Sequence, residues 1–364
     1  MTLTPVRYFA LFVLIFCTNA CKQSGSDSSR SADAGLLDSR EIPIFGFKSQ
    51  SFEAVSAADV GCDAEAPDVF FTFKEGFDVD NAYMLLLASL TTEQDIEVAK
   101  SQFEAWGFER VDVWEHSLLG MRAYVAEHET FVLVAYRGTS NPTEYLSNAM
   151  FTTTEADFVN DTEEQASTSK AHLGFWGVHK NSRLEMHNLI AQRGGLEKPV
   201  LFAGHSRGGA LATLQAAYFA ERGGEIASIY TFAQPRLGNT PLSSALNELL
   251  GDRYFRMDYE HDVTPRVPPS KDMATPLYNE GYIPSWLADT VEKLDYAHDP
   301  GELYLLSEAG YLELDTDGYS SQLDFWRRLF LAFPNPILSL PDLVKYFPSN
   351  HNPRVYICNL ARGM

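Results

Sequence analysis

Ser206 lies in a sequence setting that suits nucleophilic catalysis. It occupies the centre of a G-x-S-x-G pattern within VLFAGHSRGGALA, residues 200–212. The apolar run before the pattern predicts a strand and the alanine- and leucine-rich run after it predicts a helix, with a tight turn at the serine. A nucleophile at such a turn has a strained backbone, so we expect Gly204, His205 and Gly208 to form an elbow whose glycines keep side chains away from Ser206. The alternative is an ordinary glycine-rich turn with a solvated serine.

A serine hydroxyl becomes a good nucleophile only when a base takes its proton and a third group fixes the tautomer of that base. In one known chain order the serine is followed by an acid and then by a histidine. Asp262 follows a predicted strand and is the candidate acid, although a turn or capping aspartate is the alternative. His298 and His351 both follow it. His351 lies on a loop-like stretch that suits a mobile base, so we predict Ser206, Asp262 and His351 as the catalytic residues.

Four further segments accompany the serine motif in a fixed order: VAYRGT at 134–139, HLGF at 172–175, TFAQPRLGN at 231–239 and DVTPRVPP at 262–269. Together with GHSRGGALA at 204–212 they resemble the class 3 lipases, the fungal-lipase-like branch of the α/β-hydrolases. The resemblance extends from about residue 70 to the C-terminus. It implies an α/β-hydrolase fold, with a mostly parallel sheet covered by helices on both faces.

The resemblance also implies roles for particular residues. The late histidine followed shortly by tyrosine matches His351, whereas His298 matches a segment that is structural in relatives. The backbone N–H groups of Arg207 and Thr139 are expected to form the oxyanion hole, although Thr139 could simply belong to a turn. Arg207 stands where relatives usually carry leucine, but only its N–H is needed. His172 and Arg137 are expected to be structural.

The function that the resemblance implies is a serine carboxylester hydrolase, a triacylglycerol-type lipase that works through an acyl-enzyme. Phospholipase A1 or short-chain esterase activity is the alternative within the same class. A lipid-binding surface lipoprotein without turnover is the alternative from a different class. The apolar residues of 142–151 are interpreted either as a lid helix or as plain core.

Composition restricts the partners. The 364 residues carry a formal net charge of −21, which argues against nucleic acid and against electrostatic docking on anionic lipid. An ester or lipid substrate remains the expected partner. No cofactor and no metal are expected, because no histidine and carboxylate spacing suggests ligands.

The N-terminus has the pattern of a targeting segment. Arg7 precedes an apolar run, residues 8–16, that is too short to span a bilayer, so residues 1–20 are predicted to be a signal peptide. Ala20 directly before Cys21 suggests a bacterial lipoprotein signal with a lipid on Cys21, and plain cleavage is the alternative. We expect an exported protein that is lipid-anchored in a bacterial cell envelope, or otherwise secreted or periplasmic. A flexible tether at 21–40 and a lipase-like domain at 60–364 complete the predicted organisation.

Two cysteines remain for the mature fold, Cys62 and Cys358. Two thiols in an oxidising compartment most simply pair, and the resemblance implies the same disulfide. Two separate buried thiols are the alternative.

Alternating strand and helix patterns run from residue 80 to residue 259, as expected for a largely parallel sheet. Residues 273–347, before His351, are predicted to form an α-rich excursion over the site. The acidic, threonine-rich run 152–169 is predicted to be a surface loop.

Overall fold

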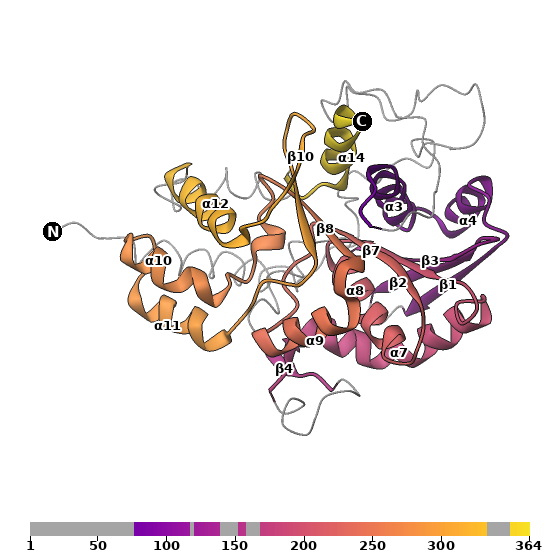
Figure 1. Ribbon diagram of the computed structural model, residues 1–364, viewed down its shortest axis with the longest axis horizontal. Helices are drawn as coiled ribbons and strands as arrows, with labels where there is room; N and C mark the ends of the chain where they lie inside the picture. Colours follow the sequence, from indigo (N-terminus) through magenta and orange to yellow (C-terminus); the bar gives the residue numbers. More distant parts are fainter. Residues whose placement is uncertain (1–75, 117–119, 139–151, 158–167, 333–349) are drawn as a thin grey trace, which may run out of the picture.

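The computed structural model describes residues 76–116, 120–138, 152–157, 168–332 and 350–364, and an eight-stranded sheet forms their centre (Figure 1). The strands lie in the order β1-β2-β3-β6-β7-β8-β9-β10. Neighbours from β3 to β9 are parallel, whereas β1, β2 and β10 join antiparallel at the two edges. The predicted mostly parallel α/β-hydrolase sheet is thus confirmed. Its strands are β1 (Arg110–His116), β2 (Met121–Glu127), β3 (Val132–Tyr136), β6 (Val200–His205), β7 (Ile226–Phe232), β8 (Tyr254–Tyr259), β9 (Glu302–Leu306) and β10 (Leu312–Leu314).

The central strands are largely apolar because both faces of the sheet are covered. Every residue of β3 and β6 is buried, as parallel strands between two helical layers require. Along β3, Leu133 and Ala135 enter one core and Val132 and Val134 enter the other. Helices α3 (Val79–Thr91), α4 (Ile96–Ala105) and α14 (Pro353–Gly363) cover the first face, and α7 (Leu173–Gln192), α8 (Arg207–Ala220) and α9 (Thr240–Leu250) cover the second (Figure 1).

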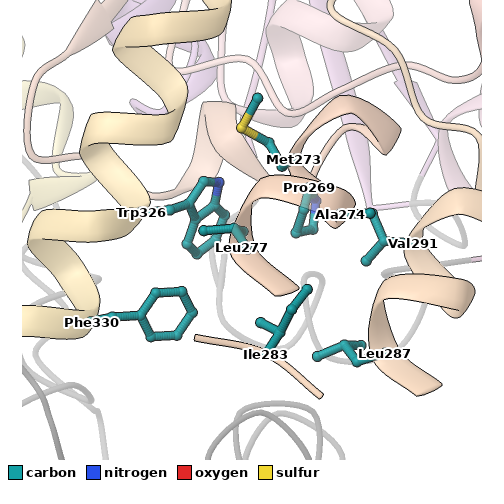
Figure 2. A pocket seen from close by; sticks show the side chains of 9 residues that line it. All are labelled: Pro269, Met273, Ala274, Leu277, Ile283, Leu287, Val291, Trp326 and Phe330. Carbon is teal, nitrogen blue, oxygen red and sulfur yellow. The ribbon is translucent and has the colours of Figure 1, made fainter. Parts of the chain in front are cut away.

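A third core lies at one end of the molecule, among α10 (Ala274–Asn279), α11 (Ser285–Leu294) and α12 (Gly318–Ala332) (Figure 1). Side chains from these helices and the turns beside them converge on a narrow apolar cavity (Figure 2). We call these three helices the helical excursion. They form a packed unit of their own.

Two predictions for segments outside the central elements need correction. The stretch 273–347 is not only helical, because β9 and β10 lie within it and extend the main sheet beyond β8. Each is so short that its apolar residues show no clear strand period, and pairing with a neighbour decides the structure. The stretch 152–169 is not only a loop, since β4 (Thr153–Glu155) pairs antiparallel with β5 (Lys170–His172). Among the described residues, no helix combines the length and hydropathy needed to cross a bilayer.

The turn between β6 and α8 depends on two glycines. The backbone of Ser206 has φ 57° and ψ −129°, a conformation that residues other than glycine rarely adopt. A Cβ on Gly204 would lie 2.2 Å from the carbonyl carbon of Gly208, and a Cβ on Gly208 would lie 2.4 Å from the carbonyl oxygen of Tyr136. The backbones of β6, α8 and β3 therefore approach one another so closely that Gly204 and Gly208 have no room for a side chain.

We expect Gly208→Ala to lower the free energy of unfolding by at least about 3 kcal/mol, because rigid backbone faces the added methyl group. Gly177→Ala is the matched control, since a Cβ at this α7 position meets nothing within 4 Å. It should raise stability by about 0.5–1 kcal/mol through helix propensity. Urea denaturation followed by circular dichroism measures both. Equal effects from the two variants would contradict the close contact at the turn.

Candidate active site

The structure brings Ser206, Asp262 and His351 into one hydrogen-bonded chain. The Ser206 Oγ lies 2.8 Å from the His351 Nε2, and the His351 Nδ1 lies 2.8 Å from the Asp262 Oδ2. The serine stands between β6 and α8, the aspartate follows β8, and the histidine precedes α14. Their exposed fractions are 6%, 0% and 4%, so the three side chains are almost wholly buried. This arrangement can move a proton from the hydroxyl to the imidazole while the carboxylate holds the ring.

His298 lies elsewhere. Its Nε2 is 3.2 Å from the Ser270 Oγ, and its carbonyl accepts a hydrogen bond from the Ser243 hydroxyl. Burial, followed by the nearby guanidinium groups of Arg236 and Arg256, lowers the pKa of His298 to about 3. The neutral, buried His298 thus links the segments of Ser243 and Ser270. Among the hydrogen bonds of the described residues, none joins His298 to Ser206.

The Asp262 carboxylate is held by two groups besides His351. Its Oδ1 accepts the backbone N–H of Thr264 at 2.8 Å, and its Oδ2 accepts the Tyr356 hydroxyl at 2.8 Å. The same hydroxyl accepts the backbone N–H of Tyr259, the last residue of β8. Tyr356 thus ties α14 to β8 and to the aspartate that follows this strand. In the sequence, Tyr356 only marks the late histidine that it follows by five residues; its bond to Asp262 emerges from the structure.

Buried arginines hold the loop that carries Asp262. The Arg266 Nη1 donates to the carbonyl oxygens of Asp262 and Tyr259, and the Arg236 Nη1 donates to those of Arg266 and Pro268. The Arg236 Nη2 also donates to the Gln322 Oε1 on α12 at 3.0 Å. The helical excursion is therefore linked to the loop of the aspartate. Sequence reasoning missed this network, because each partner is distant in the chain.

The neighbours of Ser206 lie as an elbow requires. Arg207 is the first residue of α8, and its side chain donates to the carbonyl of Gly120, which leads the guanidinium toward β2. Its backbone N–H belongs to the first turn of the helix, where amides have no intrahelical acceptor. His205 is buried with its ring centroid 4.7 Å from that of His351, and burial lowers the pKa of His205 well below its ordinary value. An uncharged ring thus packs beside His351.

The two residues expected to be structural contact groups other than Ser206, His351 and Asp262. The His172 Nδ1 accepts the backbone N–H of Gly174 and caps α7. Arg137 pairs with Glu93 at 3.3 Å.

Thr139, residues 142–151, Cys21 and Cys62 lie outside the described residues. Cys358 on α14 is disulfide-bonded, and its partner also lies outside them. No group of three metal-ligating side chains occurs within the described ranges.

Residues 133–272 match the family model described as Lipase (class 3). The matched region includes Ser206 and Asp262 and ends before His351.

Sequence comparison finds relatives that are named for two kinds of activity. The chain is 28% identical over 163 residues to a secreted mono- and diacylglycerol lipase A of Penicillium cyclopium, covering 43% of this chain and 50% of the relative. It is 30% identical over 158 residues to phospholipase A1-II 4 of Oryza sativa subsp. japonica, covering 38% and 40%. The chain thus spans half or less of the length of these relatives.

Solved structures resemble the chain more loosely. The native propeptide complex of Rhizomucor miehei lipase superposes with a TM-score of 0.49 at 17% identity, covering 72% of this chain and 85% of that one. A mutant form of MDLA from Penicillium cyclopium has a TM-score of 0.48 at 18% identity, with 68% and 89% covered.

A second carboxylate, Asp258, lies in β8 close to the site. It is 1% exposed, and its Oδ2 is 3.8 Å from the Arg256 Nη2. Burial raises the pKa of Asp258 to about 6, and the Arg256 and Arg266 guanidinium groups oppose this rise. Between a pH of about 4 and 6, Asp258 is therefore protonated in the folded chain, whereas an aspartate in the unfolded chain, with a pKa of about 3.9, is ionised.

Stability should consequently fall as the pH rises between about 4 and 7, because the unfolded state binds fewer protons in this range. The asparagine side chain of the Asp258→Asn variant cannot ionise, so the stability of this variant lacks the pH dependence that Asp258 contributes. We expect the unfolding free energy of the parent minus that of Asp258→Asn to decrease over this range, by up to about 3 kcal/mol. Urea unfolding at several pH values measures the difference. A difference that stays constant or grows with pH would contradict the raised pKa.

Proposed function

We propose that this chain is a serine carboxylester hydrolase that acts on lipids through an acyl-enzyme. The single observation that carries the proposal is the unbroken chain of 2.8 Å contacts from the Ser206 Oγ through His351 to the Asp262 Oδ2. The match of residues 133–272 to the model described as Lipase (class 3) supports it independently. The chemistry follows from what each group can do.

In the first step the Ser206 Oγ attacks the ester carbonyl carbon, and the His351 Nε2 takes the hydroxyl proton. The carbonyl oxygen becomes an oxyanion, which the backbone N–H groups of Arg207 and Thr139 would bind. The imidazolium then donates its proton to the leaving alcohol, which departs and leaves the acyl group on Ser206. Water, deprotonated by His351, then attacks the acyl carbon. The bond to the Ser206 Oγ breaks, the Oγ takes the proton from His351, and the carboxylic acid is released.

Asp262 acts on His351 and not on the substrate. Its carboxylate accepts the Nδ1–H, which keeps the Nε2 lone pair directed at Ser206, and its negative charge stabilises the imidazolium. The bonds from Thr264 and Tyr356 fix the carboxylate in the orientation that this role needs. The neutral ring of His205 adds no competing charge beside the imidazolium.

The proposed substrate is an acylglycerol, with triacylglycerol-type lipase activity as the first candidate. The relatives named as mono- and diacylglycerol lipase and as phospholipase A1 support glycerol-linked acyl esters as the class. Hydrolysis rates on tributyrin, triolein and phosphatidylcholine separate these candidates. A lipid-binding protein without turnover is the second candidate, and it predicts binding of all three lipids with hydrolysis of none.

Export is part of the proposal. The relative from Penicillium cyclopium is named as secreted, which agrees with a signal peptide at 1–20. We further propose a lipid anchor on Cys21, a tether at 21–40, a hydrolase domain at 60–364 and a bond between Cys62 and Cys358. Mass spectrometry of the exported protein tests both cysteine proposals. An unmodified Cys21 would refute the lipid anchor, and a different partner for Cys358 would refute the proposed disulfide.

The assignment of the base is the sharpest test of the mechanism. His351→Ala should lower kcat on p-nitrophenyl butyrate by a factor of about 10⁴ or more, because Ser206 loses its proton acceptor. The melting temperature should change little. His298→Ala should lower the melting temperature, through loss of the Ser270 contact, and leave folded enzyme active. An active His351→Ala variant together with a folded, inactive His298→Ala variant would reverse the assignment.

A further inference from the structure

Two buried side chains of α12, Gln322 and Phe325, contact the arginines that hold the loop of Asp262. The Gln322 Oε1 accepts a hydrogen bond from the Arg236 Nη2 at 3.0 Å. The guanidinium carbon of Arg266 lies over the Phe325 ring, 4.3 Å from its centroid. Residues three apart on a helix are neighbours on its surface. One side of α12 thus meets both arginines.

The two arginines hold consecutive parts of the same loop. The Arg266 Nη1 donates to the carbonyl oxygen of Tyr259, at 3.2 Å, and to that of Asp262 itself. The Arg236 Nη1 donates to the carbonyl oxygen of Arg266 and, at 2.6 Å, to that of Pro268. Two side chains therefore hold the backbone at several points between residues 259 and 268, and α12 contacts both of them.

Arg236 depends on Gln322 in particular. Within the described part of the chain, the hydrogen-bond acceptors of this buried cation are the carbonyl oxygens of Arg266 and Pro268 and the side-chain oxygen of Gln322. Its Nε has no partner. A buried charge is costly unless it is hydrogen-bonded. Loss of the Gln322 oxygen would leave the Nη2 unpaired as well, so the guanidinium and the loop that it holds would shift.

Such a shift reaches the catalytic base. The Asp262 Oδ2 and the His351 Nδ1 are 2.8 Å apart, and the carbonyl oxygen of the same aspartate is bound by Arg266. Movement of this backbone would therefore move the carboxylate that orients the imidazole. A misplacement of about 1 Å, caused by a change far from the reacting atoms, can lower a rate by about two orders of magnitude.

We infer that Gln322 and Phe325 are positioning residues, through which the helical excursion holds Asp262 at hydrogen-bonding distance from His351. The inference rests on the proposed function, because it concerns the orientation of the base that this function requires. The competing explanation is that α12 only anchors the excursion to the body of the protein. That explanation predicts a loss of stability alone, without an effect on the catalytic rate of folded enzyme.

The first test replaces the acceptor on α12. Gln322→Leu should lower kcat on dissolved p-nitrophenyl acetate about tenfold and leave KM within about twofold of the parent value, because no group that binds the ester has changed. Gln322→Glu keeps an oxygen for Arg236, and the amide nitrogen that it replaces has no hydrogen-bond partner. This conservative variant should recover at least about half of the parent kcat.

A second variant and a control accompany it. Phe325→Leu removes the ring beneath Arg266 but keeps an apolar side chain, and we expect about a threefold loss of kcat. The control is Leu287→Ala on α11, which removes a buried side chain from the same core, where Leu287 lines the cavity between the helices (Figure 2). It should lower the melting temperature at least as much as Gln322→Leu and leave the kcat of folded enzyme unchanged.

Proton NMR reports the positioning without any substrate. In the parent, the Nδ1–H of His351 is bonded to Asp262 and should give a far-downfield signal that exchanges slowly with water. Its absence in His351→Ala assigns the signal. Gln322→Leu should broaden or abolish it, because a loosened loop exposes this proton to solvent, and Leu287→Ala should retain it.

The outcomes separate the inference from the function. A parent-like kcat and NMR signal in Phe325→Leu and in Gln322→Leu would overturn the inference, and Phe325→Leu decides alone if Gln322→Leu does not fold. An equal loss of kcat in Leu287→Ala, or no recovery in Gln322→Glu, would also overturn it. In these cases an active parent leaves the proposed function intact. If the parent cleaves no ester while its signal depends on Gln322, the hydrolase function fails and the positioning role stands.

Discussion

The strained turn at Ser206 is the constraint on which the rest of the site depends. A serine at φ 57° costs on the order of 1–3 kcal/mol and persists only where its surroundings fix it. Here β6 and α8 fix it by an approach in which Gly204 and Gly208 touch backbone directly. The Ser206 Oγ is thereby presented at the carboxyl end of a central parallel strand, where α/β sheets place their ligands. The family match includes this serine, α8 begins directly after it, and the His351 Nε2 lies 2.8 Å from its Oγ.

The partners of Ser206 come from remote parts of the chain, so their positions are held by an extended network. Tyr356 joins α14 to β8 and to Asp262, which couples the segment after His351 to the acid that orients it. Arg236 and Arg266 fasten the loop of Asp262 through its own carbonyl groups. Because Gln322 binds Arg236, the helical excursion contributes to the same scaffold. Polar groups buried in this way are costly unless paired, so the network also defines one arrangement of the loop.

The sequence alone predicted the elements whose signals are local. Apolar runs revealed β3 and β6, the glycines marked the turn at Ser206, and chain order left only His298 or His351 as the base. The elements that sequence reasoning missed depend on contacts between distant residues. Strands β9 and β10 are short and ambiguous until β8 offers its edge, and the pairing of Arg236 with Gln322 joins residues 86 positions apart. Neither leaves a periodic pattern that single-sequence analysis detects.

The central claim is that Ser206 is an activated nucleophile. A fluorophosphonate probe reacts with serines whose hydroxyl is deprotonated by a neighbouring base, and peptide mapping by mass spectrometry locates the adduct. The account predicts one adduct on the peptide containing Ser206 in folded protein and none after unfolding in urea. An adduct on a different serine, or no adduct on folded protein, would contradict it.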